Sequence, residues 1–204
     1  MTTHFGRLTT ASLLLLVLAP SAIIAHPAPA GRLDVPSVPA SLEVPDGHVV
    51  YMKGSAVGTQ NYVCLPTASG PAWVFLGPQA TLYQPAGAVY PQLTTHFLAP
   101  NPDEDGTARP SWQHSFDSSQ IWGRARAAST DPGFVEPGAI AWLLVEIVGA
   151  RRGSLGSAAL SQTTFIQRVN TSGGVAPSTA CQVGSVALVP YSTDYFFYRA
   201  RSSR

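Results

Sequence analysis

Short apolar segments separated by Gly, Pro, Asp and Ser recur along the chain from residue 48 to residue 198. They are rich in Val, Ile, Thr, Phe, Tyr and Trp, the residue types that favour strands. We expect strands over 48–52, 59–64, 72–76, 81–83, 94–98, 120–123, 140–148, 163–170, 186–189 and 195–198. Short strands spaced by roughly ten residues are typical of antiparallel sheets. The pattern therefore predicts an all-β, mostly antiparallel β-sandwich or barrel with long loops.

The first 45 residues lack this pattern. Residues 1–10 are polar and contain Arg7, and residues 11–19 form an apolar run of nine. This order is typical of a secretory signal peptide, because a membrane span needs about 20 apolar residues. We expect cleavage after residue 25, with an uncleaved anchor as the alternative. Residues 26–45 hold five prolines and predict a Pro-rich, extended leader, so that residues 46–204 form a single β-rich domain.

Composition narrows the class of protein. Hydrophobic residues make up 45% of the chain and charged residues 11%, well below the roughly 25% charge of an ordinary soluble domain. This balance excludes an intrinsically disordered protein. The 12 basic and 11 acidic residues nearly cancel, so no global field attracts nucleic acid or anionic lipid. We expect a secreted, extracellular protein, with the periplasm or the cell surface as alternative locations, and no membrane span after cleavage.

Export changes the interpretation of Cys64, Cys181 and Asn170. Two cysteines in an oxidising compartment have one possible pairing, so a Cys64–Cys181 disulfide is predicted. Such a bridge is worth roughly 4–5 kcal/mol in the chain-entropy model. Two unrelated buried thiols are the alternative. Asn170 begins an Asn-Thr-Ser sequon, which predicts glycosylation only in a eukaryotic host.

His96, His114 and Asp117 are the candidate chemical groups. They converge if residues 94–98 and 111–114 pair as strands. Two imidazoles and a carboxylate suit a divalent metal, and the same three residues suit acid–base work. No HxH or HExxH spacing supports either, so the alternative is histidines hydrogen-bonded to loops. We expect no other cofactor.

Aromatic residues suggest a binding surface. Trp112 and Trp122 lie among polar residues that include Arg109, which makes them the better candidates for a surface patch suited to a sugar. Burial in the core is the alternative, since it is the default for a Trp in a strand. Trp73 and Trp142 lie in apolar runs and are expected in the core.

A single carboxylate interrupts the most apolar segment of the chain. Glu146 lies between Val145 and Ile147. A lone buried carboxylate is costly, so it needs solvent or a partner. Arg168, in another strand-like run, is the predicted partner.

Several segments together match a known family. They are 58–64, 73–83, 110–114, 141–144, 164–174, 189–191 and 194–198. In combination they resemble the secreted bacterial and fungal family called domain of unknown function 3455, from about residue 42 to residue 199. The resemblance implies an exported, β-rich protein without an established activity. At Ser118 many relatives have Gly, which leaves the turn geometry there open.

Some fungal relatives carry the label malate dehydrogenase. A dinucleotide site needs GxGxxG at a turn between a strand and a helix. Gly149, Gly153 and Gly156 have a different spacing. The sequence therefore argues against an NAD-dependent malate dehydrogenase.

Two functions stay open. The first is a non-catalytic extracellular or cell-surface domain with a binding or structural role, for carbohydrate or another small ligand. The alternative is a small secreted enzyme or metal-binding protein that uses His96, His114 and Asp117.

Overall fold

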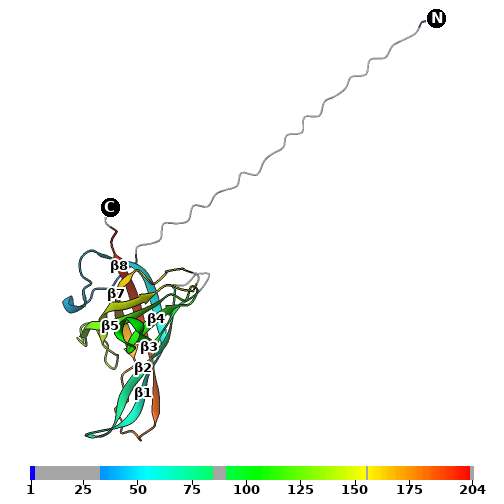
Figure 1. The fold of residues 1–204 in the computed structure, drawn as a ribbon. Coiled ribbons are helices and arrows are strands. Elements are labelled where there is room, and N and C mark those ends of the chain that lie inside the picture. Colours follow the sequence, from blue (N-terminus) through cyan, green and yellow to red (C-terminus); the bar gives the residue numbers. More distant parts are fainter. Residues whose placement is uncertain (3–32, 85–90, 155, 203–204) are drawn as a thin grey trace. The chain divides into compact units, whose positions relative to one another are not determined.

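A closed barrel of eight antiparallel strands forms the body of the protein (Figure 1). The computed structural model describes residues 1–2, 33–84, 91–154 and 156–202. Each strand pairs with the next, and the last closes the barrel on the first. The strands are β1 (His48–Thr67), β2 (Gly70–Tyr83), β3 (Gln92–Asn101), β4 (Thr107–His114), β5 (Gln120–Ser129), β6 (Trp142–Arg151), β7 (Thr163–Gly173) and β8 (Val186–Ala200). The predicted all-β, antiparallel class is confirmed, and the architecture is a barrel.

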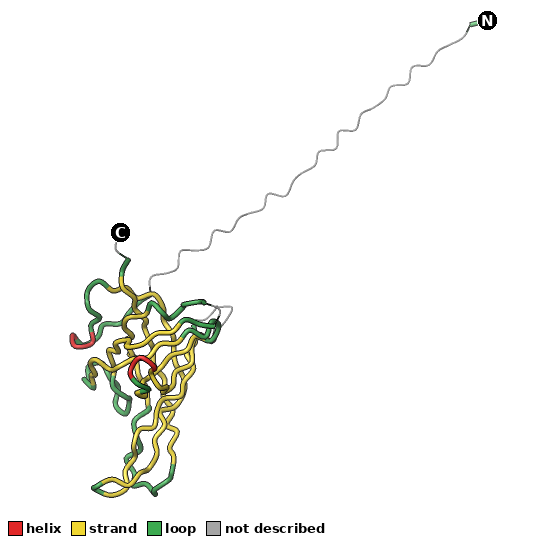
Figure 2. The backbone as a smooth tube through the Cα atoms, viewed as in Figure 1, coloured by secondary structure: helices red, strands yellow, loops and turns green. Residues whose placement is uncertain are grey.

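Helical structure is limited to two short 3-10 turns within the described ranges, η1 (Ala40–Leu42) and η2 (Pro102–Glu104) (Figure 2). In that part of the chain no helix has the length and apolar character needed to cross a membrane. The predicted signal peptide falls, beyond its first two residues, outside the described residues.

The strands are fewer and longer than the sequence pattern predicts. Strand β1 joins the predicted segments 48–52 and 59–64, and β2 and β8 each join two further segments. Small residues at inward positions of β1 interrupt the apolar pattern without ending the strand. A Cβ atom on Gly58 would lie 2.1 Å from the carbonyl oxygen of Gln79, so the close approach of β1 and β2 requires glycine there.

Strands β1 and β2 extend beyond the others as a long ribbon, with the first part of β8 beside them (Figure 1). The predicted disulfide is present in this region and joins Cys64 of β1 to Cys181. Cys181 lies in the segment before the last strand, and the Cys64 amide donates to the carbonyl of Ser185 at 2.8 Å. The bridge therefore holds the segment before β8 against β1.

Two apolar clusters stabilise the barrel. The inner one fills the barrel and includes Leu82, Trp112, Ile121, Ile166, Tyr195 and Phe197. The outer one lies on the other face of β6, β7 and β8 and includes Leu42, Trp142, Leu144, Phe165, Val169, Phe196 and Tyr198. Alternate residues of one strand thus serve separate cores, as the pleat of a β-strand requires.

Residues 33–45 cover the outer cluster. Leu42 is fully buried there, and its carbonyl oxygen accepts a hydrogen bond of 2.7 Å from Nε2 of Gln167. The compact unit therefore begins at Leu33, earlier than the predicted boundary at residue 46. The apolar residues between the prolines of this segment explain the difference, because Val35, Val38 and Val44 pack on the outer cluster.

Candidate ligand-binding site

A partly open cavity of about 230 Å³ lies at one end of the inner core of the barrel. We call it the inner cavity. Its walls include the side chains of Gln60, His96, Trp112, Leu143, Arg168 and Tyr195. The strand register explains this set, because His96 pairs with Trp112, and Arg168 pairs with both Tyr195 and Leu143. Directly opposed residues on neighbouring strands share a face of the sheet. Exposed Phe75 and Ala125 also border the cavity.

His96 provides a neutral hydrogen-bond acceptor in the wall. Its ring stacks on Trp112 with 4.3 Å between centroids and meets Tyr195 edge-on at 5.3 Å. The Nδ1 atom lies 2.9 Å from the carbonyl oxygen of Ser111. A carbonyl only accepts, so Nδ1 carries the proton and Nε2 has a free lone pair. Burial lowers the pKa of His96 to about 3, which keeps the ring neutral at physiological pH.

Arg168 places a positive charge in the same wall. Its Nε and Nη2 atoms donate to the carbonyl oxygen of Ala141 at 3.1 and 2.7 Å. Within the described residues the ion pairs involve other cations, so the half-buried Arg168 has no carboxylate partner. A cation withdrawn from water without a counter-ion is costly. The inner cavity therefore carries an uncompensated positive charge.

The predicted pair of Glu146 and Arg168 is wrong. Glu146 lies opposite Phe165 on the outer face, and its carboxylate is 3.2 Å from Arg124 and 3.8 Å from Arg126. Arg168 lies opposite Leu143, an odd number of positions away from Glu146 along β6. Because the side-chain period of a strand is two, the two charged groups point to opposite faces of the sheet.

Four buried polar atoms have no well-formed hydrogen bond among the described residues, three on residues that line the inner cavity and one on Tyr191, which adjoins two of them. They are Nε2 of Gln60, Nε1 of Trp112 and the hydroxyls of Tyr191 and Tyr195. The hydroxyls of Tyr191 and Tyr195 lie close to each other, Tyr191 lies close to the Gln60 amide, and Tyr195 lies close to the Arg168 guanidinium. None of these contacts reaches the distance and angle of a well-formed hydrogen bond. Burial raises the pKa of both hydroxyls, so both remain protonated. Unpaired buried groups of this kind cost about 1–3 kcal/mol each.

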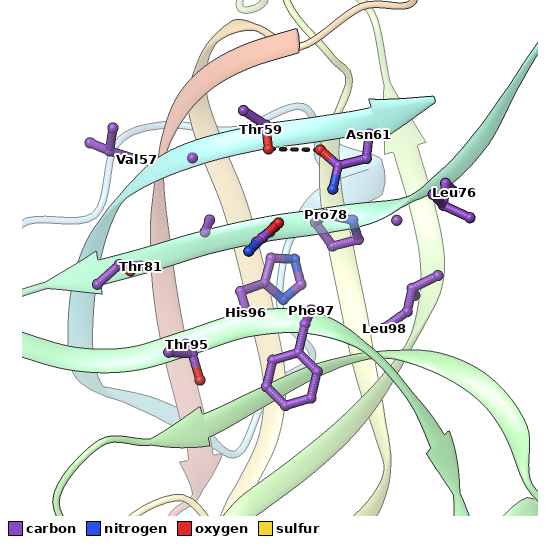
Figure 3. A pocket seen from close by; sticks show the side chains of 14 residues that line it. Val57, Thr59, Asn61, Leu76, Pro78, Thr81, Thr95, His96, Phe97 and Leu98 are labelled. Atoms are coloured by element: carbon purple, nitrogen blue, oxygen red, sulfur yellow. Dashed lines mark hydrogen bonds between the residues drawn. The ribbon is translucent and has the colours of Figure 1, made fainter. Parts of the chain in front are cut away.

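A wider groove adjoins the inner cavity. Strands β2 and β3 pair only from Gln79 opposite Phe97 to Tyr83 opposite Gln92, and both continue beyond that ladder. A groove of about 690 Å³ lies there, and Pro78 and His96 border both it and the inner cavity. Figure 3 shows these two side chains between the strands, with Thr59 and Asn61 on the neighbouring strand β1.

The expected surface patch of tryptophans is wrong. Trp112 and Trp122 are only 1% and 2% exposed. Trp112 points into the barrel, and the guanidinium of Arg151 lies over the ring of Trp122 at 5.7 Å from its centroid. Arg109 instead forms two hydrogen bonds of 2.8 Å with Glu104. Trp112 can therefore meet a ligand only from inside the barrel.

The other two tryptophans differ from each other. Trp142 is buried in the outer cluster, as predicted. Trp73 is half-buried, and its Nε1 atom donates to the carbonyl oxygen of Thr179 at 3.1 Å. The indole of Trp73 thus helps to hold the segment before β8.

The structure brings His114 and Asp117 together but leaves His96 apart. Nδ1 of His114 is 3.1 Å from Oδ1 of Asp117. Across the described ranges no three His, Cys, Asp or Glu side chains are grouped to hold a metal ion. His96 uses its ring against Trp112 instead.

Asp117 organises a loop. Its carboxylate accepts hydrogen bonds from the amide and hydroxyl of Ser119 and from the amide of Ala159. Burial raises its pKa, but these hydrogen bonds and His114 outweigh burial and leave the pKa below its ordinary value. Ser118 beside it has a φ of +58°, the conformation that glycine adopts most easily.

Asn170, the predicted glycosylation site, is exposed at a φ of +52°. Its Nδ2 atom donates to Oδ2 of Asp194 at 3.0 Å. Glycosylation stays a prediction.

Sequence reasoning singled out His96 and Trp112 of the inner cavity but missed the other polar residues in and beside it. Gln60, Tyr191 and Tyr195 carried no motif, and Arg168 was considered only as a partner for Glu146. One signal was available, because Arg168 is two positions from Ile166 and therefore shares its inward face.

Comparison with known proteins gives a family match. A family model described as "Protein of unknown function (DUF3455)" matches residues 45–199. Neither a curated protein nor a solved structure matches the chain.

Proposed function

Since the chain belongs to the DUF3455 family of proteins of unknown function, we propose from the site itself that the barrel binds a small molecule in the inner cavity. The observation that carries the proposal is the group of partnerless polar atoms of Gln60, Trp112, Tyr191 and Tyr195. Buried polar atoms in native proteins are nearly always paired. A ligand that forms hydrogen bonds with these atoms therefore stabilises the barrel relative to its ligand-free state.

The size of the inner cavity limits the ligand. Its volume of about 230 Å³ equals that of roughly seven or eight water molecules in the liquid and is below the about 300–1,000 Å³ of pockets for drug-sized ligands. A ligand of the size of one substituted ring fits this space, whereas an oligosaccharide does not. The disulfide between Cys64 and Cys181 supports an extracellular setting for this binding.

Ligand-detected NMR with ring-sized probes tests the proposal. Benzyl alcohol, benzamide and benzoate are each offered to the wild type and to Ala125→Leu. Ala125 borders the cavity and is exposed, so a larger side chain obstructs the opening without overpacking the core. The matched control is Ala128→Leu, an exposed position on the same strand outside the cavity lining.

We expect at least one probe to bind the wild type and Ala128→Leu equally. Its affinity for Ala125→Leu should fall about tenfold, equivalent to about 1.4 kcal/mol. Absence of binding by all three probes, or equal binding by both variants, would overturn the proposed function.

A further inference from the structure

The charge of the inner cavity indicates which ligands it accepts. The half-buried guanidinium of Arg168 has no carboxylate partner among the described residues. The groups around it are uncharged, since His96 is neutral and the hydroxyls of Tyr191 and Tyr195 are protonated. The site therefore carries a net positive charge in a low-dielectric setting, which favours an anion.

The free hydrogen-bonding groups agree with this sign. A guanidinium has five N–H bonds, and Arg168 uses two of them on Ala141. Five minus two leaves three N–H groups without a well-formed hydrogen bond to the described residues, although the Tyr195 hydroxyl lies close to the guanidinium. Nε2 of Gln60 and Nε1 of Trp112 are further donors, and both are unpaired. An acceptor-rich ligand such as a carboxylate satisfies these groups, whereas a cation does not.

The remaining wall suits a flat apolar body. The stacked rings of His96 and Trp112 form one side, and the apolar side chains of Leu143 and Val145 form part of the rest. Exposed Phe75 lies at the edge of the lining. An aromatic ring fits between such surfaces in stacked or edge-on contact.

We infer that the inner cavity recognises a small aromatic carboxylate, whose anionic group pairs with Arg168 and whose ring lies against His96 and Trp112. This inference rests on the proposed function and adds the chemical class of the ligand. An Arg–carboxylate pair forms two parallel hydrogen bonds, which gives both affinity and orientation.

Benzoate and benzamide provide the test, because they have the same size and shape and differ in charge. Their affinities are measured by isothermal titration for the wild type, Arg168→Gln and Arg126→Gln. Arg126 is an exposed cation on β5, outside the cavity lining, so its variant controls for the loss of one positive charge. Charge-assisted hydrogen bonds predict an at least tenfold weaker binding of benzoate by Arg168→Gln, and unchanged binding by Arg126→Gln.

Tyr195→Phe extends the test in case Arg168→Gln fails to fold. This variant keeps the ring and removes a hydroxyl that lacks a protein partner, so folding is retained. Benzoate should bind Tyr195→Phe several-fold more weakly than it binds the wild type. The affinity of benzamide should differ less between the two proteins. Equal binding of benzoate and benzamide by the wild type overturns the inference and leaves the small-molecule site intact. Failure of both probes and of benzyl alcohol overturns the proposed function as well.

Discussion

We expect the substitution of Phe for Tyr to change the stability of the protein in opposite directions at two positions of β8, Tyr195 and Tyr198. Tyr195 points into the barrel and is 1% exposed, and its hydroxyl has no hydrogen-bond partner among the described residues. Tyr198 belongs to the outer cluster, and its hydroxyl donates to Oε1 of Gln167. Replacing each by Phe therefore removes an unsatisfied group in one case and a made hydrogen bond in the other.

The magnitudes follow from what each variant leaves behind. In Tyr195→Phe the ring stays against His96 and Trp112 while the desolvated hydroxyl disappears, so the ligand-free protein should gain about 1 kcal/mol of unfolding free energy. In Tyr198→Phe the buried Gln167 side chain loses a partner, which should cost about 1–3 kcal/mol. Gln167 also anchors the Leu42 carbonyl, so loosening of residues 33–45 adds to that cost.

Urea denaturation of ligand-free protein, followed by circular dichroism, measures both changes. At roughly 2–4 °C per kcal/mol for a domain of this size, the two variants should also shift the melting temperature in opposite directions. A clear loss of stability in both variants would refute the reasoning, because it would mean that the Tyr195 hydroxyl already has a partner in the empty barrel.

Two further predictions concern the loop at Asp117. Ser118→Gly should raise the unfolding free energy by about 0.5 kcal/mol, measured by thermal melts. The left-handed φ of Ser118 costs an L-residue about 1–2 kcal/mol, and the greater entropy of glycine in the unfolded chain offsets part of the gain from relieving it. A lower melting temperature contradicts this. The lowered pKa of Asp117 stabilises the fold above the unfolded carboxyl pKa of about 3.9, and the contribution is lost as pH falls through the lower folded pKa. Asp117→Asn should therefore be less stable than wild type near neutral pH, and the gap should narrow below about pH 3.9; a constant gap in acid titrations argues against this role.

The sequence was sufficient for the class of fold and for the disulfide, but not for the closure of the barrel. Closure depends on pairing β1 with β8, for example His48 with Ala200 and Val63 with Val186. Such pairs are remote in the sequence and leave no local signal. Gly54 and Gly58 further divided β1 into two apparent strands, because a tight barrel wall and a turn both favour small residues.

The site was harder to predict than the fold. The polarity of the residues next to a side chain in the sequence does not show whether that side chain is exposed. Trp112 is flanked by polar Ser111 and Gln113, which suggests a surface position. In a strand, however, those neighbours point away from Trp112, and its own face is set by the cross-strand partners His96 and Ile121. Period-two alternation within β4 is therefore a better guide to the site than local composition.

The distribution of satisfied and unsatisfied polar groups separates a binding site from imperfect packing. On the outer cluster, Thr193 donates to the carbonyl of Val169, and Gln167 is bonded to both Leu42 and Tyr198. Elsewhere in the described residues the partnerless atoms are single ones, on Thr94, Trp122 and Trp142. Around the inner cavity four such atoms gather beside one uncompensated cation. One partnerless atom, on Trp142, does belong to the outer cluster. A ligand that supplies hydrogen-bond acceptors accounts for the larger group beside Arg168, where four such atoms lie together.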